Sequence, residues 1–258
     1  MTGGAHSEGV SALLESGFRD AVMVVMGGRG GIGGEVVRQA AALGARVVIG
    51  SSSAGEETLN SPAAGEAATL RVDIRDSSSV ARFFGEIERA IGRIDILVNS
   101  AGASRQIPLR RLDLLADELI DDVFASNALG VLKTIREATP LLKAGRDPVI
   151  VNVTSVAART GGGSNLAYVG AKASVEAMSV GLAKALAPEI RVVCVAPSAL
   201  DTGFVRDRSA DFFDATIKAT PLARLTSLAE VANAILCAAR ILTATTGVSI
   251  AVDGGRHL

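Results

Sequence analysis

The chain of 258 residues carries a formal net charge of −1, and 48% of its residues are apolar. This apolar content supplies a sizeable core and excludes extensive disorder. Acidic and basic residues are interspersed, so we expect no partner among nucleic acids and no anionic membrane surface as a partner. The length suits a single α/β domain.

Cysteine and histidine are too scarce for several kinds of site. Cys194 and Cys237 lie in apolar segments, outside any metal-ligand spacing, and are expected to be reduced core residues. His6 and His257 lie near opposite ends of the chain. A histidine-based metal site and a Ser-His-Asp triad are therefore excluded, and no metal is expected.

The N-terminal segment shows no targeting signal. Residues 1–19 lack a basic stretch followed by an apolar run, and no apolar stretch approaches the roughly 18 to 20 residues that span a bilayer. We expect a cytoplasmic protein with an N-terminal arm over 1–19 and a single domain over 20–258.

Short Val- and Ile-rich runs alternate with longer helical patterns along the rest of the chain. The expected strands are 21–28, 45–50, 68–73, 93–100, 147–155, 190–198 and 247–255, and the expected helices are 31–44, 77–92, 112–145, 166–188 and 227–240. Continuous apolar strands are buried on both faces. Their alternation with helices predicts a single Rossmann-type, doubly wound parallel sheet of about seven strands with helices on both faces.

A glycine-rich turn, GGRGGIGG over 27–34, joins the first strand to the first helix. Glycine permits a tight turn and lets a pyrophosphate approach the N–H groups at the helix N-terminus. A turn without a ligand is the alternative, but the flanking strand and helix favour a dinucleotide site.

The end of the second strand bears on the choice of cofactor. An acid there would hold the ribose 2′-hydroxyl and repel a 2′-phosphate, yet Gly50 is followed by three serines, 51–53, with no acid before Glu56. These hydroxyls and the nearby Arg29 favour NADP(H) over NAD(H), unless Arg29 is simply solvated.

Ser155, Tyr168 and Lys172 are candidates for proton chemistry. Tyr168 and Lys172 are four apart on an expected helix, so they share a face. An ammonium near a phenol lowers its pKa towards the working pH of a general acid/base. Such a pair alone is more often a core edge and a solvated charge. Ser155 favours an active site because it follows a strand, where parallel sheets bind ligands.

At these positions the chain resembles the short-chain dehydrogenase/reductase family, from about residue 20 onward. In chain order, the matching motifs are TGxxxGxG at Met26 to Gly33, the Asp after the third strand at Asp73, NNAG at Asn99 to Gly102, the helix asparagine at Asn127, the catalytic Ser155, Tyr168 and Lys172, PGxVxT at Pro197 to Thr202, and VDGG at Val252 to Gly255.

The resemblance implies an NAD(P)-dependent enzyme that interconverts a ketone and a secondary alcohol. It assigns Tyr168 as the general acid/base and Ser155 as the hydrogen-bond donor to the reacting oxygen. Lys172 would bind the nicotinamide ribose and lower the pKa of Tyr168, and Asn127 would hold a water of a proton relay. Hydride transfer belongs to the cofactor, so no metal is implied.

The family also implies a set of cofactor-binding residues, in which Asp73 contacts the adenine and Asn99 lies beside the adenosine ribose. The set comprises Gly27, Arg29, Gly31, Ile32, Gly33, Ser51, Ser52, Asp73, Ile74, Asn99, Ala101, Gly102, Tyr168, Lys172, Pro197, Ser198, Leu200 and Thr202.

Three positions depart from the family pattern. Met26 replaces a threonine, Ser100 replaces an asparagine, and Ser198 replaces a glycine whose backbone lies close to the nicotinamide. The side chain of Ser198 is expected to crowd the ring or reshape the pocket. Because the four catalytic positions are intact, we expect an active enzyme.

The substrate and the assembly follow only from the resemblance. Similarity to 3-oxoacyl-carrier-protein reductases favours a 3-oxoacyl thioester; the alternatives are a sugar, polyol or steroid alcohol, or a non-catalytic dinucleotide-binding regulatory protein. The substrate loops would be 103–111 and 156–165 with a lid near 199–226, in which Arg206 and Arg208 either meet an anion or are solvated. A homotetramer is expected, formed through the two long helices 112–145 and 166–188 and the C-terminal strand.

Overall fold

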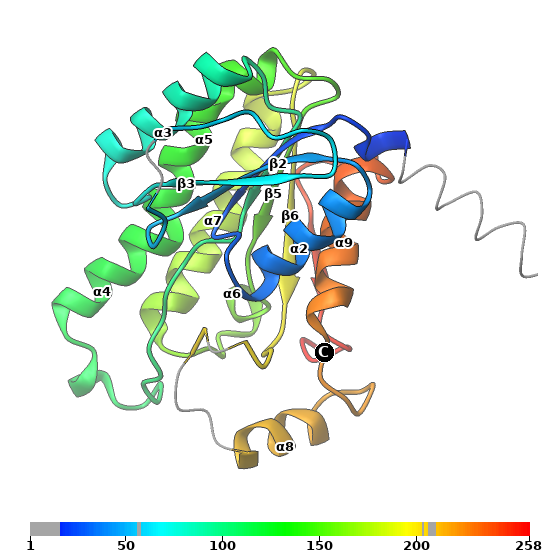
Figure 1. The fold of residues 1–258 in the computed structure, drawn as a ribbon. Coiled ribbons are helices and arrows are strands. Elements are labelled where there is room, and N and C mark those ends of the chain that lie inside the picture. Colours follow the sequence, from blue (N-terminus) through cyan, green and yellow to red (C-terminus); the bar gives the residue numbers. More distant parts are fainter. Residues whose placement is uncertain (1–15, 56–57, 203, 206–209) are drawn as a thin grey trace, which may run out of the picture.

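Seven parallel strands form one sheet, in the order β3-β2-β1-β4-β5-β6-β7 (Figure 1). The computed structural model describes residues 16–55, 58–202, 204–205 and 210–258. The strands are β1 (Val22–Met26), β2 (Arg46–Ser51), β3 (Ala67–Arg71), β4 (Ile96–Asn99), β5 (Val149–Val153), β6 (Arg191–Pro197) and β7 (Ser249–Val252). The strand order reverses between β1 and β4, which confirms the expected Rossmann-type sheet.

Helices cover both faces of this sheet (Figure 1). They are α2 (Gly31–Ala42), α3 (Ser77–Ala90), α4 (Asp117–Phe124), α5 (Gly130–Lys143), α6 (Ala157–Thr160), α7 (Leu166–Ala185), α8 (Ala210–Lys218) and α9 (Leu228–Arg240), with the short turns η1 (Leu112–Leu114) and η2 (Ala125–Leu129). Apolar residues of α3, α5 and α7 belong to one buried cluster, and those of α2 and α9 belong to the other.

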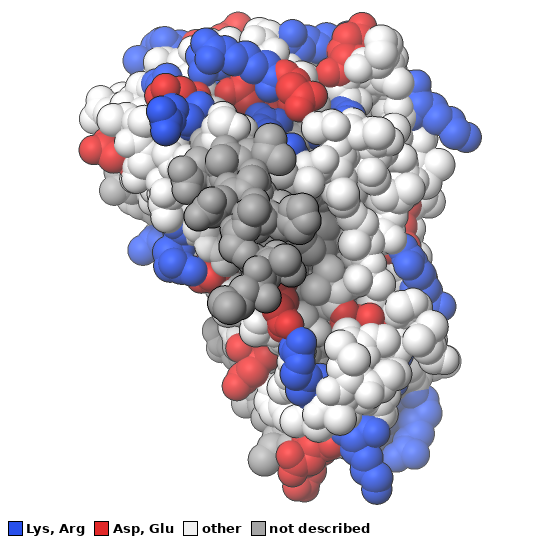
Figure 2. Space-filling model, turned by 90° about the vertical axis from the view of Figure 1, so that its right-hand side faces the viewer, with Lys and Arg blue, Asp and Glu red and all other residues white. Residues whose placement is uncertain are grey.

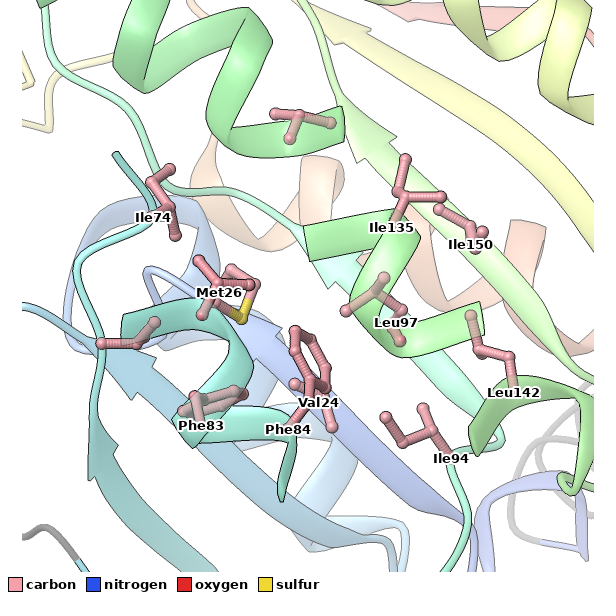
Figure 3. Close-up of a cluster of buried hydrophobic side chains, with 14 of the residues drawn as sticks. Val24, Met26, Ile74, Phe83, Phe84, Ile94, Leu97, Ile135, Leu142 and Ile150 are labelled. Carbon is pink, nitrogen blue, oxygen red and sulfur yellow. The ribbon is translucent and has the colours of Figure 1, made fainter. Parts of the chain in front are cut away.

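Successive residues of β1 enter opposite clusters. Val24 and Met26 of β1 pack with Phe83 and Phe84 of α3 (Figure 3), whereas the residues between them in the chain face α2 and α9. This double burial explains why the strands read as unbroken apolar runs. Met26 occupies space beside Gly50, where an added Cβ would lie 2.9 Å from the methionine Sδ. Met26 therefore makes apolar contacts at the position where the family pattern has a threonine hydroxyl.

The segment 112–145 is not one helix as expected. It begins with η1, continues as α4, widens into the π-helical turn η2 and resumes as α5. The widened turn contains Asn127, whose amide donates to the Val123 carbonyl at 3.0 Å and to the Ala103 carbonyl of a separate loop at 2.7 Å. Such π-turns are frequent at functional sites.

A buried carboxylate ties the strands together at their amino ends. Asp95 is 1% exposed, and its two oxygens accept the Val22 N–H at 2.7 Å and the Arg146 N–H at 2.6 Å. Arg93 Nε lies 3.4 Å from the same carboxylate. These bonds join the start of β1 to the segments before β4 and β5, at the edge opposite the strands' carboxyl ends.

The expected N-terminal arm lies outside the described residues as far as position 15. The residues that follow are packed against the domain, because Phe18 is fully buried and the Gly17 carbonyl accepts Arg240 Nε at 2.9 Å. Over the ranges that the structure describes, every helix is too short or too polar to cross a membrane. Basic and acidic side chains are intermixed on the face shown in Figure 2.

Candidate active site

A cavity of about 1100 Å³ lies at the carboxyl ends of the strands. Its walls come from the turn after β1, the ends of β2 and β3, the segments after β4 and β5, the first turns of α7 and the segment after β6. In an open parallel sheet this edge is where ligands bind.

The glycine-rich turn is shaped by close backbone contacts. Gly27 has a φ of +79°, and a Cβ on it would lie 2.8 Å from the Ala101 Cα. A Cβ on Gly33 would lie 2.4 Å from the Gly27 carbonyl oxygen. The first turn of α2 therefore packs directly on the glycine-rich turn, and its residues Gly31 and Ile32 line the cavity.

The start of α7 places Tyr168 in the cavity wall. Asn165 caps this helix, since its Oδ1 accepts the Tyr168 N–H at 2.8 Å. The amide of Asn165 donates to the Arg105 carbonyl at 2.8 Å and contacts Ser104 Oγ at 3.2 Å. One buried side chain thus ties the position of Tyr168 to the loop after β4.

Lys172 lies one helical turn beyond Tyr168 on α7. Its Nζ donates to the Val153 carbonyl at 2.9 Å and lies 5.7 Å from the centre of the Tyr168 ring. Only 5% of the residue is exposed, and this burial lowers the pKa of Lys172 to about 8. The ammonium is thus still the major form at neutral pH and acts on the ring with little solvent between them.

The pKa of Lys172 makes stability depend on pH. The folded protein loses this proton near pH 8 and the unfolded chain near 10.5, so the unfolded state binds more protons between these values. The free energy of unfolding should therefore rise through this window, by on the order of 3 kcal/mol. Urea unfolding at pH 7.5 and 10 should show this gain in the wild type relative to Lys172→Met. Equal pH dependence of the two proteins would contradict it.

Ser155 directly follows β5 and lines the same cavity. Its Oγ accepts the Ala157 N–H at 3.2 Å and lies 3.5 Å from the Pro197 carbonyl. The serine rotamer is therefore held by backbone on two sides. Ser155, Tyr168 and Lys172 all line this one cavity.

Asn127 does not line the cavity but lies behind it. Its Oδ1 is buried and accepts no hydrogen bond from a described residue. A Cβ on Gly102 would lie 2.4 Å from this oxygen, so the glycine leaves room for the asparagine. The unsatisfied acceptor is compatible with a bound water, because buried polar atoms are rarely left without a partner.

Most of the expected cofactor residues line the cavity. They are Gly27, Gly31, Ile32, Ser51, Ser52, Asp73, Ile74, Ala101, Gly102, Tyr168, Lys172, Pro197, Ser198, Leu200 and Thr202. Ser198 does so with no positive φ, so its backbone does not require the family's glycine.

Three expected cofactor residues lie outside the cavity wall. Gly33 is buried under the turn. Arg29 extends over the serines and donates to the Ser53 carbonyl at 2.7 Å. Asn99 is turned into the sheet, where its amide donates to Asn152 Oδ1 and its Oδ1 accepts the Thr134 hydroxyl, both at 2.8 Å.

Other lining residues were not expected from the sequence. Arg75 pairs with Asp73 at 2.7 Å and holds the pKa of that carboxyl below its usual range. From the expected lid come Phe204 and Val205, with Phe212 and Thr216 of α8. Arg256 reaches the cavity from the segment after β7. For the lid residues, the apolar side chains of that segment were the available sequence signal. Arg256 had no such signal.

Two arginines expected in the lid, Arg206 and Arg208, lie outside the described residues. The neighbouring Phe204 ring contacts the Tyr168 ring, with centroids 5.9 Å apart. The segment expected to form the lid thus contacts the cavity wall at Tyr168 through an aromatic pair.

Comparison with known proteins gives consistent matches over nearly the whole chain. A protein-family model described as enoyl-(acyl carrier protein) reductase matches residues 27–257. The chain is 33% identical to the protein named ketoacyl reductase 2 of the granaticin polyketide synthase of Streptomyces violaceoruber, covering 92% of this chain and 96% of that protein. It is 29% identical to the 3-oxoacyl-acyl-carrier-protein reductase FabG of Escherichia coli K12, covering 93% and 99%.

Solved structures share the fold at similar coverage. A protein from Brucella melitensis, described as short-chain dehydrogenase/reductase SDR:glucose/ribitol dehydrogenase, matches with a TM-score of 0.84 and 27% identity over 94% of this chain and 98% of that one. The Pseudomonas aeruginosa RhlG/NADP active-site complex matches with a TM-score of 0.82 and 25% identity, over 94% and 99%.

Proposed function

The chain belongs to the short-chain dehydrogenase/reductase family and is an NAD(P)-dependent oxidoreductase, and we propose that it interconverts a ketone and a secondary alcohol with Tyr168 as general acid/base. The observation that carries the proposal is that Ser155, Tyr168 and Lys172 line one cavity. We call the part of the cavity surface that they form the catalytic wall. Placed there, a substrate carbonyl meets one hydroxyl that hydrogen-bonds it and one that can protonate it.

The described residues fit a nicotinamide dinucleotide. The turn excludes side chains at Gly27 and Gly33 and places the N-terminus of α2, the end that favours a pyrophosphate, at the cavity. When bound, the nicotinamide supplies or accepts the hydride. The protein holds the proton on Tyr168 Oη, and the Lys172 ammonium favours the phenolate left after that proton reaches the substrate oxygen.

We further propose that NADP(H) is preferred to NAD(H). Arg29 is held beside Ser51 and Ser52 through its bond to the Ser53 carbonyl, and the Ser51 and Ser53 hydroxyls lie 3.1 Å apart. Glu56 lies outside the described residues. A 2′-phosphate at the end of β2 would meet a guanidinium and hydroxyl donors.

Arg29→Ala should weaken NADPH binding about tenfold, which corresponds to about 1.4 kcal/mol, while NADH binding stays nearly constant. Fluorescence titration with each cofactor measures both affinities. Arg38→Ala, which removes an exposed arginine of α2 paired with Glu35, is the matched control. Tighter binding of NADH than NADPH by the wild type would contradict the preference.

For the substrate we propose a 3-oxoacyl thioester. Beyond the catalytic wall the cavity carries apolar side chains, among them Leu109, Phe204 and Phe212, and the charged residue Arg256. The structure gives the Arg256 guanidinium no ion pair with a described residue. These apolar side chains suit an acyl chain, and the guanidinium suits an anionic carrier. The named reductase relatives agree.

The test compares two thioesters that differ in charge. The enzyme should reduce both acetoacetyl-CoA and acetoacetyl-N-acetylcysteamine with NADPH. Arg256→Ala should raise KM about tenfold for the phosphate-bearing CoA ester only, as expected for a lost charge-assisted bond. Oxidation of sugars or polyols without thioester reduction would favour the dehydrogenase alternative. Cofactor binding without any turnover would favour a regulatory role.

A homotetramer and a cytoplasmic location stay predictions. Exposed apolar side chains on the two long helical segments support a subunit contact there, since Leu129 is 52% exposed, Leu132 40% and Val180 43%. Val248, beside β7, is 44% exposed on the strand expected to form the second contact.

A further inference from the structure

Glu176 accepts three hydrogen bonds behind the catalytic wall, one of them also an ion pair, although it does not line the cavity. Its Oε1 accepts the hydroxyls of Thr154 at 3.1 Å and of Ser249 at 2.5 Å. Its Oε2 accepts Arg159 Nε at 3.2 Å, and Arg159 Nη2 also donates to the Ser249 carbonyl at 2.9 Å. One carboxylate thus joins β5, α6, α7 and β7.

These partners bracket Ser155 in the chain. Thr154 directly precedes it, is buried, and has its N–H bonded to the Val195 carbonyl of β6 at 2.8 Å. Arg159 follows it by four residues, in α6. Both ends of the short segment that carries Ser155 are therefore attached to Glu176.

The same helix carries the general acid. Tyr168, Lys172 and Glu176 follow one another at intervals of four on α7, so they share one face. Lys172 binds the Val153 carbonyl and Glu176 binds the next residue, Thr154. Helix α7 is thereby attached to the end of β5 at two successive residues.

We propose that Glu176 is a positioning residue that sets the Ser155 hydroxyl at its working distance from Tyr168 Oη, an inference that rests on the proposed function. A role in stability does not explain the ion pair between Glu176 and Arg159, because an ion pair with an arginine at 38% side-chain exposure contributes little stability. The bonds from buried or half-buried hydroxyls to a carboxylate are charge-assisted and directional, which suits a role in geometry.

Glu176→Gln tests the proposal at constant size. In the glutamine side chain an NH₂ donor replaces one of the two accepting oxygens. The variant can therefore no longer accept hydrogen bonds from both hydroxyls and from Arg159 at the same time. We expect kcat to fall about tenfold to a hundredfold, as for small misplacements of catalytic groups, with KM, NADPH affinity and thermal unfolding nearly unchanged. The matched control is Glu88→Gln, on the exposed face of α3, which should keep full activity.

The deciding measurement is a double-mutant cycle with Ser155→Ala. If Glu176 acts through Ser155, Glu176→Gln should have no further effect on kcat once the serine hydroxyl is absent. If the two substitutions instead lower kcat by factors that multiply in the double variant, the inference is overturned and the proposed function stands. A Ser155→Ala variant with wild-type turnover would instead overturn the proposed function itself.

A second pair keeps the inference testable should Glu176→Gln fold poorly. Thr154→Ser retains the hydroxyl that Glu176 accepts, whereas Thr154→Val removes it at nearly constant shape. The serine variant should keep kcat and the valine variant should lose it to the same degree as Glu176→Gln. Equal kcat for the two Thr154 variants would contradict the role of this bond.

Discussion

Tyr168→Phe should reduce turnover by about a thousandfold while leaving NADPH affinity within twofold of the wild type. The change removes one oxygen, and positioned proton transfer contributes about 10² to 10⁴ in rate. The phenylalanine ring keeps the contact with Phe204 and its place beneath Lys172 Nζ. Packing and cofactor binding should therefore survive the loss of chemistry.

Steady-state reduction of a ketone and a fluorescence titration with NADPH measure the two effects separately. Thermal unfolding of the variant checks that the fold is intact. Retention of more than a tenth of wild-type kcat would rule out Tyr168 as the principal proton donor. Lost cofactor binding would instead indicate that the hydroxyl has a structural role.

Gly33→Ala should weaken cofactor binding tenfold to a hundredfold and lower stability. The new methyl group would lie 2.4 Å from the Gly27 carbonyl oxygen, and the nearby atoms are backbone, which cannot rotate away. Relieving the clash must move the turn away from the helix. Overpacking of this kind costs about 1 to 3 kcal/mol, which for binding is about tenfold to a hundredfold.

The adjacent glycine provides the control. A Cβ on Gly34 would lie 3.7 Å from its nearest neighbours. Since alanine is the better helix former, Gly34→Ala should leave NADPH affinity unchanged and raise the free energy of unfolding by about 0.5 to 1 kcal/mol. Denaturant unfolding and the same titration measure both variants. Equal NADPH affinities of the two variants would contradict the account of the turn.

The strands were predictable because a doubly covered sheet requires apolar side chains on both of its faces. Each of the seven apolar runs overlaps one strand of the structure, although β2 ends one residue later and β3 begins one residue earlier than expected. Helices α6 and α8 were not predicted, and the four residues of α6 are too few to show a helical period. The break between α4 and α5 was also missed, because a π-turn at Asn127 leaves the apolar pattern continuous.

Within the site, the sequence predicted which residues lie at strand ends better than it predicted where their side chains point. Ser155, Asp73 and Ala101 follow strands and line the cavity as expected. Asn99 ends β4 as well, but its side chain enters the network with Thr134 and Asn152. Strand alternation does not reveal such a choice, because it depends on which polar partners neighbouring elements supply. Arg256, in the short segment after β7, was not predicted to line the cavity.

The bonds of Asp95 lie at the opposite ends of the strands from Ser155 and Tyr168. This carboxylate holds β1 and the segments before β4 and β5 with backbone N–H groups, and none of its partners lines the cavity. Exchanges in the loop 103–111 or in the lid therefore leave these attachments intact. The part of the molecule that shapes the substrate site can therefore change without altering this attachment at the other end of the sheet.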